Sequence, residues 1–236
     1  MSQAPYDIIA DEYYDSFHKT CRNFDETTIQ AIKSLKFDIP KNGLLLEVGA
    51  GRGRAKEFLN IDSNRVIQLD NSIKMLNVKP RENCLIKVFH CAEKIPFDDK
   101  QFSCVISFLC DPFLGLNFLS EAFRVLKDNG LFLATIPSYE WGSVLREEIN
   151  ININETRFFT KKNKTIHIPS VLVRSEKLIE MLNVVGFQRK DIKLTKHNLP
   201  KNVNIISIDI ITAAQKSGCN KNELPILDII LALKKS

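Results

Sequence analysis

The stretch LLLEVGAGRGR, residues 44–54, places four apolar residues and a glutamate directly before three glycines that alternate with larger residues. Glycine allows positive φ angles and lets another group approach the main chain without meeting a Cβ. Such a turn, between the first parallel strand and a helix, lies at the carboxyl edge of an open α/β sheet, where these sheets bind ligands. The stretch therefore predicts a nucleotide-like ligand beside Gly49, Gly51 and Gly53.

The spacing of the glycines narrows the choice of ligand. A dinucleotide fingerprint requires G-x-G-x-x-G, and Arg54 stands where its third glycine belongs. A phosphate loop ends in Gly-Lys followed by Ser or Thr, and the stretch has a different ending. A pyrophosphate is therefore not the favoured ligand.

Apolar runs of strand length alternate with helical patterns along the rest of the chain. The runs are short and nearly continuous in apolarity, which is typical of strands covered on both faces of a parallel sheet. They comprise residues 44–48, 65–70, 84–89, 102–109 and 131–136. This succession predicts an α/β domain with a parallel central sheet.

Helical patterns occupy segments between and after these runs. Residues 115–127 carry an apolar stripe before the stop signal Asn129-Gly130, and residues 175–185 have Ser175 as a possible N-cap and end at Gly186. We also expect a helix within 203–217, a last strand within 226–235, and two strands around a lysine-rich turn within 140–174. The apolar stripe comprises Leu116, Leu119, Phe123 and Leu126.

Composition and charge set the class of protein. A chain of 236 residues with 44% hydrophobic residues can build a core without disulfide or metal support. The six cysteines lack C-x-x-C spacing, the acidic N-terminus differs from a signal peptide, and no apolar run is long enough for a membrane span, so we expect a cytoplasmic protein. The net charge of +5 is dispersed, which argues against nucleic acid without excluding it. The sequence carries no signal for the oligomeric state.

Three motifs resemble those of class I S-adenosylmethionine-dependent methyltransferases of the small-molecule type, with a domain like methyltransferase type 11. Residues 47–53 match the family's E/D-x-G-x-G-x-G, and residues 91–108 resemble its D-A-E-x-L-P-F-x-D-x-S-F-D-x-V. Residues 6–15, YDIIADEYYD, resemble its opening Y-D-x-I-A-x-x-Y-D. The resemblance covers about residues 6–140 well and the rest in outline.

The resemblance implies a Rossmann-like fold with a mostly parallel seven-stranded central sheet and helices on both faces. On this basis residues 1–236 form a single domain. It comprises an N-terminal helical lid (1–40), a cofactor-binding core (41–139), a cap insertion (140–174) and the C-terminal part of the sheet (175–236).

The resemblance further implies S-adenosylmethionine as cofactor and assigns its site. Glu47 would hold the ammonium group, Asp70 would accept from two ribose hydroxyls, and Tyr13 or Tyr14 would lie against the sulfonium. Asp70 could also be an ordinary helix N-cap. The expected cofactor-binding residues are Tyr13, Tyr14, Glu47, Gly49, Ala50, Gly51, Asp70, Asn71, Cys91, Ala92, Glu93 and Phe108.

Position 91 departs from the family pattern. The family usually has an aspartate there that accepts from the adenine amino group, whereas Cys91 is a poor acceptor. We therefore expect the backbone at Ala92, or Glu93, to contact adenine, and the hold on adenine to be weaker.

The implied function is direct in-line transfer of a methyl group to a small or medium-sized acceptor, without a metal ion. Candidates for a base are His18, Asp111, Tyr139 and His167, with His18 expected on the same helix as Tyr14. Two alternatives stay open. Asp111-Pro112-Phe113 would suit a methyltransferase acting on protein or nucleic-acid amines, and Cys91 would suit a non-catalytic cofactor sensor or partner subunit.

Overall fold

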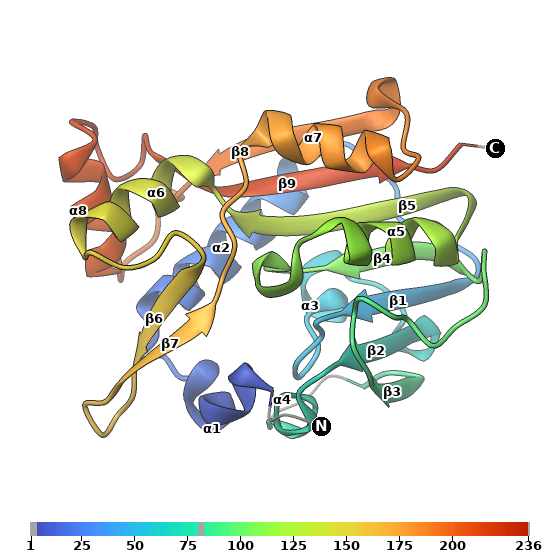
Figure 1. Ribbon diagram of the computed structural model, residues 1–236, viewed down its shortest axis with the longest axis horizontal. Helices are drawn as coiled ribbons and strands as arrows, with labels where there is room; N and C mark the ends of the chain where they lie inside the picture. The colour runs from blue at the N-terminus through green and yellow to red at the C-terminus, as the bar shows by residue number, and fades with distance from the viewer. Residues whose placement is uncertain (1–3, 80–82, 236) are drawn as a thin grey trace.

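The structure is a computed structural model that describes residues 4–79 and 83–235. Nine strands form a seven-stranded central sheet and a separate two-stranded hairpin (Figure 1). The central strands are β1 (Leu44–Val48), β2 (Val66–Asp70), β3 (Ile86–Phe89), β4 (Phe102–Ser107), β5 (Leu126–Pro137), β8 (Ile192–Asn198) and β9 (Pro225–Leu233). The hairpin consists of β6 (Glu155–Phe159) and β7 (Thr165–Pro169).

The helices cover both faces of the sheet and one end of it. The α-helices are α1 (Ala10–Tyr13), α2 (Lys19–Ser34), α3 (Ala55–Leu59), α4 (Ile73–Asn77), α5 (Leu116–Val125), α6 (Tyr139–Glu148), α7 (Ser175–Val184) and α8 (Ile208–Lys216). Four 3₁₀ turns are η1 (Pro5–Ile8), η2 (Ser63–Arg65), η3 (Asp111–Phe113) and η4 (Arg189–Asp191).

The strand order places the glycine turn at the centre of the sheet. The order is β3-β2-β1-β4-β5-β9-β8, and the pairs from β3 to β5 are parallel while β9 runs antiparallel to both neighbours. The chain passes from β1 outward to β2 and β3, and then returns to the other side of β1 as β4. The carboxyl end of β1 is therefore the switch point at which α/β sheets form a ligand crevice.

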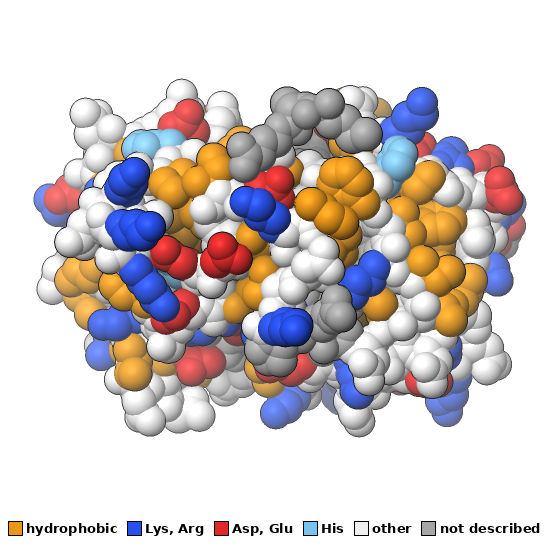
Figure 2. All heavy atoms as spheres, turned by 90° about the horizontal axis from the view of Figure 1, so that it is seen from below, with side chains coloured by type: hydrophobic (Ala, Val, Ile, Leu, Met, Phe, Trp, Pro, Cys, Tyr) orange, Lys and Arg blue, Asp and Glu red, His pale blue; other side chains and the backbone are white. Residues whose placement is uncertain are grey.

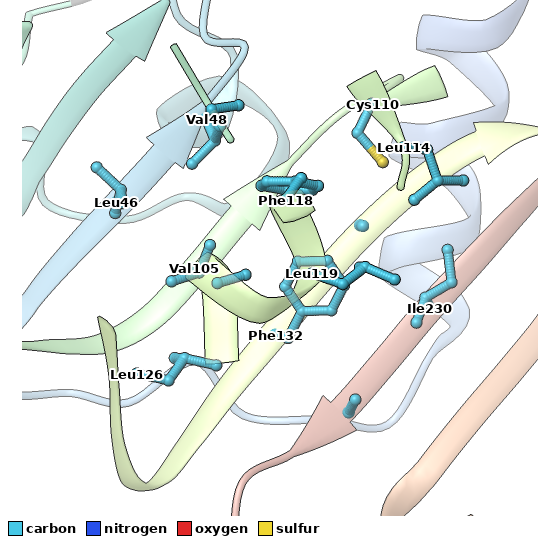
Figure 3. Packing of buried hydrophobic residues seen from close by; sticks show 14 of the residues in the cluster. Leu46, Val48, Val105, Cys110, Leu114, Phe118, Leu119, Leu126, Phe132 and Ile230 are labelled. Carbon is cyan, nitrogen blue, oxygen red and sulfur yellow. The ribbon is translucent and has the colours of Figure 1, made fainter. Parts of the chain in front are cut away.

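Neighbouring residues of each strand enter different cores, because side chains alternate between the faces of a sheet. Leu46 and Val105 belong to the core under α5 and α7, whereas Leu45 and Ile106 belong to the core under α2, α3, α6 and α8. Figure 3 shows Phe118 of α5 above the strands of the first core. This double burial confirms the expected parallel sheet with helices on both faces.

All five strands expected from apolar runs are present; the boundaries of β2, β3 and β4 differ by one or two residues, and the start of β5 differs most. β5 begins at Leu126, directly after α5, instead of at residue 131. Leu126 pairs with Phe102 of β4, residues 127–129 are exposed, and regular pairing with β4 resumes at Leu131. β8 lies outside the five runs because it is an edge strand whose residues alternate between exposed and half-buried. The expected last strand, the helix within 203–217 and the lysine-rich hairpin are confirmed as β9, α8 and β6–β7.

Three details of the expected helices were wrong. In α5 the buried stripe is Phe118, Leu119, Ala122 and Val125, whereas Leu116 is 46% exposed and Leu126 already belongs to β5. Ser175 is the first residue of α7, and its N-cap is Arg174, which makes no side-chain capping bond. His18 is the N-cap of α2, so it lies on a different helix from Tyr14, which ends α1.

In Figure 1 the β6–β7 hairpin lies at the lower left, between α6 above and α1 below. The hairpin turn binds the N-terminal segment, since Lys161 Nζ pairs with Asp15 at 2.5 Å and Lys161 N donates to Glu12 at 2.8 Å. On the face seen in Figure 2, acidic and basic side chains are interspersed. All six cysteines are free. Within residues 4–79 and 83–235, no helix combines the length and apolarity needed to cross a membrane.

The corrected stripe of α5 leads to a stability prediction. Phe118 is fully buried against the rings of Phe113 and Phe132, so Phe118→Ala should lower the free energy of unfolding by about 3 to 5 kcal/mol through lost burial and a residual cavity. Leu116→Ala, on the exposed side of the same helix, should change it by less than about 1 kcal/mol. Urea unfolding of both variants measures the difference, and equal losses would contradict the assigned stripe.

Candidate functional site

The carboxylate that ends β1 holds the start of the following helix. Glu47 Oε1 accepts from the backbone N–H groups of Arg54 and Ala55 at 2.7 and 2.9 Å, so it satisfies donors that a helix start leaves unpaired. Gln68 on β2 donates to Oε2 at 3.3 Å. The chain must therefore turn back sharply within residues 49–53, and all three glycines there have positive φ (67°, 52° and 93°).

A second carboxylate fixes the same turn from the neighbouring strand. Asp70, at the end of β2, accepts from Gly51 N through Oδ2 and from Ser72 N through Oδ1, both at 2.8 Å. Ser72 is the N-cap of α4, because its hydroxyl accepts from Met75 N at 3.0 Å; the alternative of Asp70 as the cap was wrong. Burial raises the pKa of Asp70 to about 6, and the nearby Asp7 carboxylate adds to the rise.

A cavity of about 270 Å³ lies beside this turn. Eleven of the twelve expected cofactor-binding residues line it, from β1, β2, α1 and the segment after β3, and Gly51 is the exception. Leu69, Met75 and Phe113 add apolar surface to its wall. The lining residues from the expected set are Tyr13, Tyr14, Glu47, Gly49, Ala50, Asp70, Asn71, Cys91, Ala92, Glu93 and Phe108.

The absence of a side chain at Gly51 leaves space for the hydroxyl of Tyr14 from the N-terminal segment. A Cβ at Gly51 would collide with the hydroxyl of Tyr14, which accepts from Arg52 N at 3.1 Å. A Cβ at Gly49 would lie 2.7 Å from the ring of Phe113. The glycines therefore admit two aromatic rings against bare backbone, and the expected close approach at Gly51 is made by Tyr14.

An arginine cluster beside Tyr14 was absent from the sequence expectations. Three guanidinium groups surround its ring, with Arg52, Arg54 and Arg22 at 4.3, 5.1 and 5.8 Å from the ring centroid. Asp25 of α2 pairs with both Arg22 and Arg54 and lines the cavity. No local motif marks Asp25, because it reaches the site through the packing of α2 on α3.

A second cavity of about 540 Å³ adjoins the first. Tyr6, Tyr13 and Leu109 line both cavities, so the rings of the N-terminal segment form part of both walls. The remaining wall comes from α2, α6, the β6–β7 hairpin and the start of α8. Residues from the two segments expected as lid (1–40) and cap insertion (140–174) therefore line the same cavity.

Two of the four candidate bases line the second cavity. His18 is buried, and its burial lowers the pKa of the ring. Asp111 accepts from Ser170 Oγ at 2.6 Å, Arg146 donates to the same hydroxyl at 2.6 Å, and burial raises the pKa of Asp111 to about 6. Tyr139 and His167 lie outside both cavities: Tyr139 contacts Arg174, and His167 lies on the exposed side of the hairpin beside Glu155.

Comparisons with known proteins agree with this geometry. A family model described as a methyltransferase domain matches residues 46–134. An uncharacterized protein of Methanocaldococcus jannaschii is 28% identical over 163 residues, which span 65% of this chain and 62% of that protein. The chain therefore spans less than two thirds of the length of this curated relative.

Solved structures share the whole fold at low sequence identity. A possible histamine N-methyltransferase of Thermotoga maritima has a TM-score of 0.64 and 19% identity over 98% of both chains. The putative methyltransferase of Haloferax volcanii, solved in complex with the Trm112 methyltransferase activator, has a TM-score of 0.70 and 14% identity over all of both chains.

The sheet order and the crevice at the end of β1 define the class I methyltransferase fold. The family match covers β1, the glycine turn, Asp70 and the segment after β3. Residues 46–134 accordingly match a methyltransferase domain, and the fold around them is that of class I S-adenosylmethionine-dependent methyltransferases.

The first cavity suits S-adenosylmethionine, the cofactor of this family. It combines a carboxylate at the end of β2 with apolar walls and with the aromatic rings of Tyr13 and Tyr14. Asp70 could accept from vicinal hydroxyls, and an electron-rich ring face attracts a sulfonium cation.

The raised pKa of Asp70 leads to a pH prediction. Protonation of Asp70 below pH 6 removes the charge that strengthens its hydrogen bonds to hydroxyl groups, so the affinity for S-adenosylhomocysteine should fall by about tenfold from pH 7.5 to pH 5. Calorimetric titration at both values measures the change. Asp70→Asn should bind weakly at both, and an unaltered pH dependence in that variant would assign the effect to another group.

Proposed function

We propose that the protein transfers the methyl group of S-adenosylmethionine to a small or medium-sized acceptor held in the second cavity. The observation that carries this proposal is the common wall of the two cavities, formed by Tyr6, Tyr13 and Leu109. A methyl donor in the first cavity and an acceptor in the second would meet at that wall. The division into lid, core, cap and C-terminal part of one domain stays part of the proposal, and residues 1–3 of the lid lie outside the described residues.

S-adenosylmethionine, when bound, supplies a methyl group already activated by its sulfonium. The task of the chain is then to align the acceptor with that methyl group and to exclude water. Tyr6 and Tyr13 serve the second purpose, since their half-buried rings stand in the wall between the two cavities. The link from Lys161 to Asp15 holds the hairpin against the same segment.

A base is needed only for an acceptor that is protonated at working pH. We propose Asp111 for that role, because it lines the acceptor cavity directly before Pro112 and Phe113, which line the cofactor cavity. Its pKa of about 6 leaves the carboxylate mostly ionised at neutral pH and able to take a proton. His18, the N-cap of α2, lines the same cavity and is the second candidate for the base.

The size of the second cavity, about 540 Å³, favours a small acceptor over the alternatives. A polynucleotide would need an open basic surface, whereas charges of both signs are interspersed on the face in Figure 2. A cofactor sensor would have no use for a second cavity against the same rings. The likeness to the Haloferax volcanii protein, solved with an activator, leaves room for an accessory subunit of this protein as well.

Removal of the Asp70 carboxylate tests the cofactor site. Asp70→Ala should weaken binding of S-adenosylhomocysteine by at least about 1 to 3 kcal/mol, because charge-assisted hydrogen bonds are lost. Isothermal titration calorimetry measures this loss, and Asp38→Ala, which removes an exposed carboxylate, should leave the affinity unchanged. Unchanged affinity in Asp70→Ala would refute the assignment of the ribose to this residue.

Transfer to an acceptor can be tested without knowing its identity. Protein incubated with cell extract and S-adenosylmethionine carrying a tritiated methyl group should place the label in the fraction below about 1 kDa, since a cavity of about 540 Å³ matches a ligand of that size. Asp70→Ala supplies the background. Label found only in protein or nucleic acid would contradict a small acceptor and favour the amine-directed alternative.

A further inference from the structure

Three side chains of the second cavity carry a buried polar atom without a hydrogen-bond partner in the described part of the chain, and two of these atoms can only donate. Trp141 Nε1 and Arg157 Nε, which can only donate, are buried and have no partner among residues 4–79 and 83–235. The ring nitrogen Nε2 of His18 is buried and unpartnered in the same described part of the chain. All three side chains line the second cavity. A buried polar group without a partner costs about 1 to 3 kcal/mol, so three in one wall indicate a missing ligand.

The acidic groups of the cavity are already engaged. Asp111 receives the hydroxyl of Ser170 and lies beside Arg146, whose positive charge balances it. Asp209 accepts from the hydroxyl of Thr20 at 2.9 Å and occupies the first turn of α8. Neither carboxylate therefore requires a cationic ligand.

The basic groups are not balanced in the same way. Arg157 packs its guanidinium over the ring of Phe159 at 5.0 Å, and Lys19 lies at the cavity on α2. Neither forms an ion pair with a carboxylate in the described part of the chain. A half-buried arginine without a counter-ion is costly, and an anion in the cavity would relieve that cost.

Aromatic and aliphatic side chains make up most of the remaining wall, beside a few hydroxyl groups. Tyr13, Phe24, Trp141 and Phe158 line the cavity, and the rings of Phe24 and Trp141 meet edge to face at 5.2 Å. Flat apolar surfaces of this kind favour an aromatic or aliphatic body. We propose that the methyl acceptor is an amphiphile with an apolar body, bound among these rings, and an anionic oxygen group such as a carboxylate, bound by Arg157 and Trp141. This inference rests on the proposed function, whose acceptor class it names.

The chain offers a direct reporter for the test. Trp141 is its single tryptophan, so emission excited at 295 nm comes from the proposed acceptor site. Three probes share one body and differ only in the head group: 3-phenylpropionate, 3-phenylpropanol and 3-phenylpropylamine. Each is titrated into the protein saturated with S-adenosylhomocysteine, and the change in Trp141 emission gives the dissociation constant.

The carboxylate should bind at least tenfold more tightly than the alcohol and the amine. Arg157→Gln should remove that preference, with about a tenfold loss for the carboxylate and little change for the alcohol. Lys162→Gln, which removes a charge from the exposed turn of the same hairpin, should leave all three affinities unchanged. Trp141→Phe deletes the indole N–H. It should weaken binding of 3-phenylpropionate, measured by calorimetry, by less than Arg157→Gln does.

The outcomes separate this proposal from the proposed function. If S-adenosylhomocysteine itself gives no heat of binding, the proposed function fails at its cofactor site. If the cofactor product binds but the amine binds most tightly, or none of the three probes changes Trp141 emission, the anionic acceptor class is overturned. Carboxylate binding that survives unchanged in Arg157→Gln overturns the assigned head-group site as well.

Discussion

The hydrogen bond from Gly51 N to the carboxylate of Asp70 joins the ends of two neighbouring strands, and the site depends on it. This bond holds the turn after β1 against the end of β2. Glu47 accepts from the first N–H groups of α3, the helix that follows. Two buried carboxylates thus hold one five-residue turn from both sides. The desolvation that this requires is visible in the raised pKa of Asp70. The contribution of Asp70 to the free energy of unfolding is greatest where the carboxyl is protonated. It falls as the pH rises from the ordinary pKa of an aspartate through 6, so the ionised carboxylate at this site destabilises the fold.

The core of the fold and most of the cofactor site could be predicted from the sequence, because both depend on local patterns. Continuous apolar runs reveal strands buried on two faces, and a carboxylate followed by spaced glycines marks the switch point. β8 was not predicted from an apolar run, because its residues alternate between exposed and half-buried and it therefore has no continuous apolar stretch. The expected stripe of α5 was wrong because it included Leu126, which already belongs to β5, and because the buried face of the helix is the one that carries Phe118. Such a boundary depends on strand pairing and not on helical periodicity.

The residues that the sequence failed to reveal all act over long separations. Asp25 reaches Arg54 only after α2 packs across the sheet, and Ser170 reaches Asp111 only after the hairpin folds back. Conversely, Tyr139 and His167 follow or belong to strands near the site, but their side chains face Arg174 and Glu155 outside the cavities. A residue's place on a strand end predicts proximity to the crevice, whereas side-chain direction is decided by tertiary packing. The second cavity itself is built almost wholly from such distant segments.

The rings shared by the two cavities have a thermodynamic consequence. Tyr13 contacts Tyr6, Tyr14 and Phe158, so its position reports on the lid, the glycine turn and the hairpin together. A ligand in one cavity that orders these rings pays the entropy cost of ordering them. A ligand that then binds in the other cavity loses less entropy. Linkage then requires the benefit to be mutual and equal in size. Because of this common wall, a ligand in either cavity changes the affinity of the other cavity for its own ligand, without any movement of the sheet.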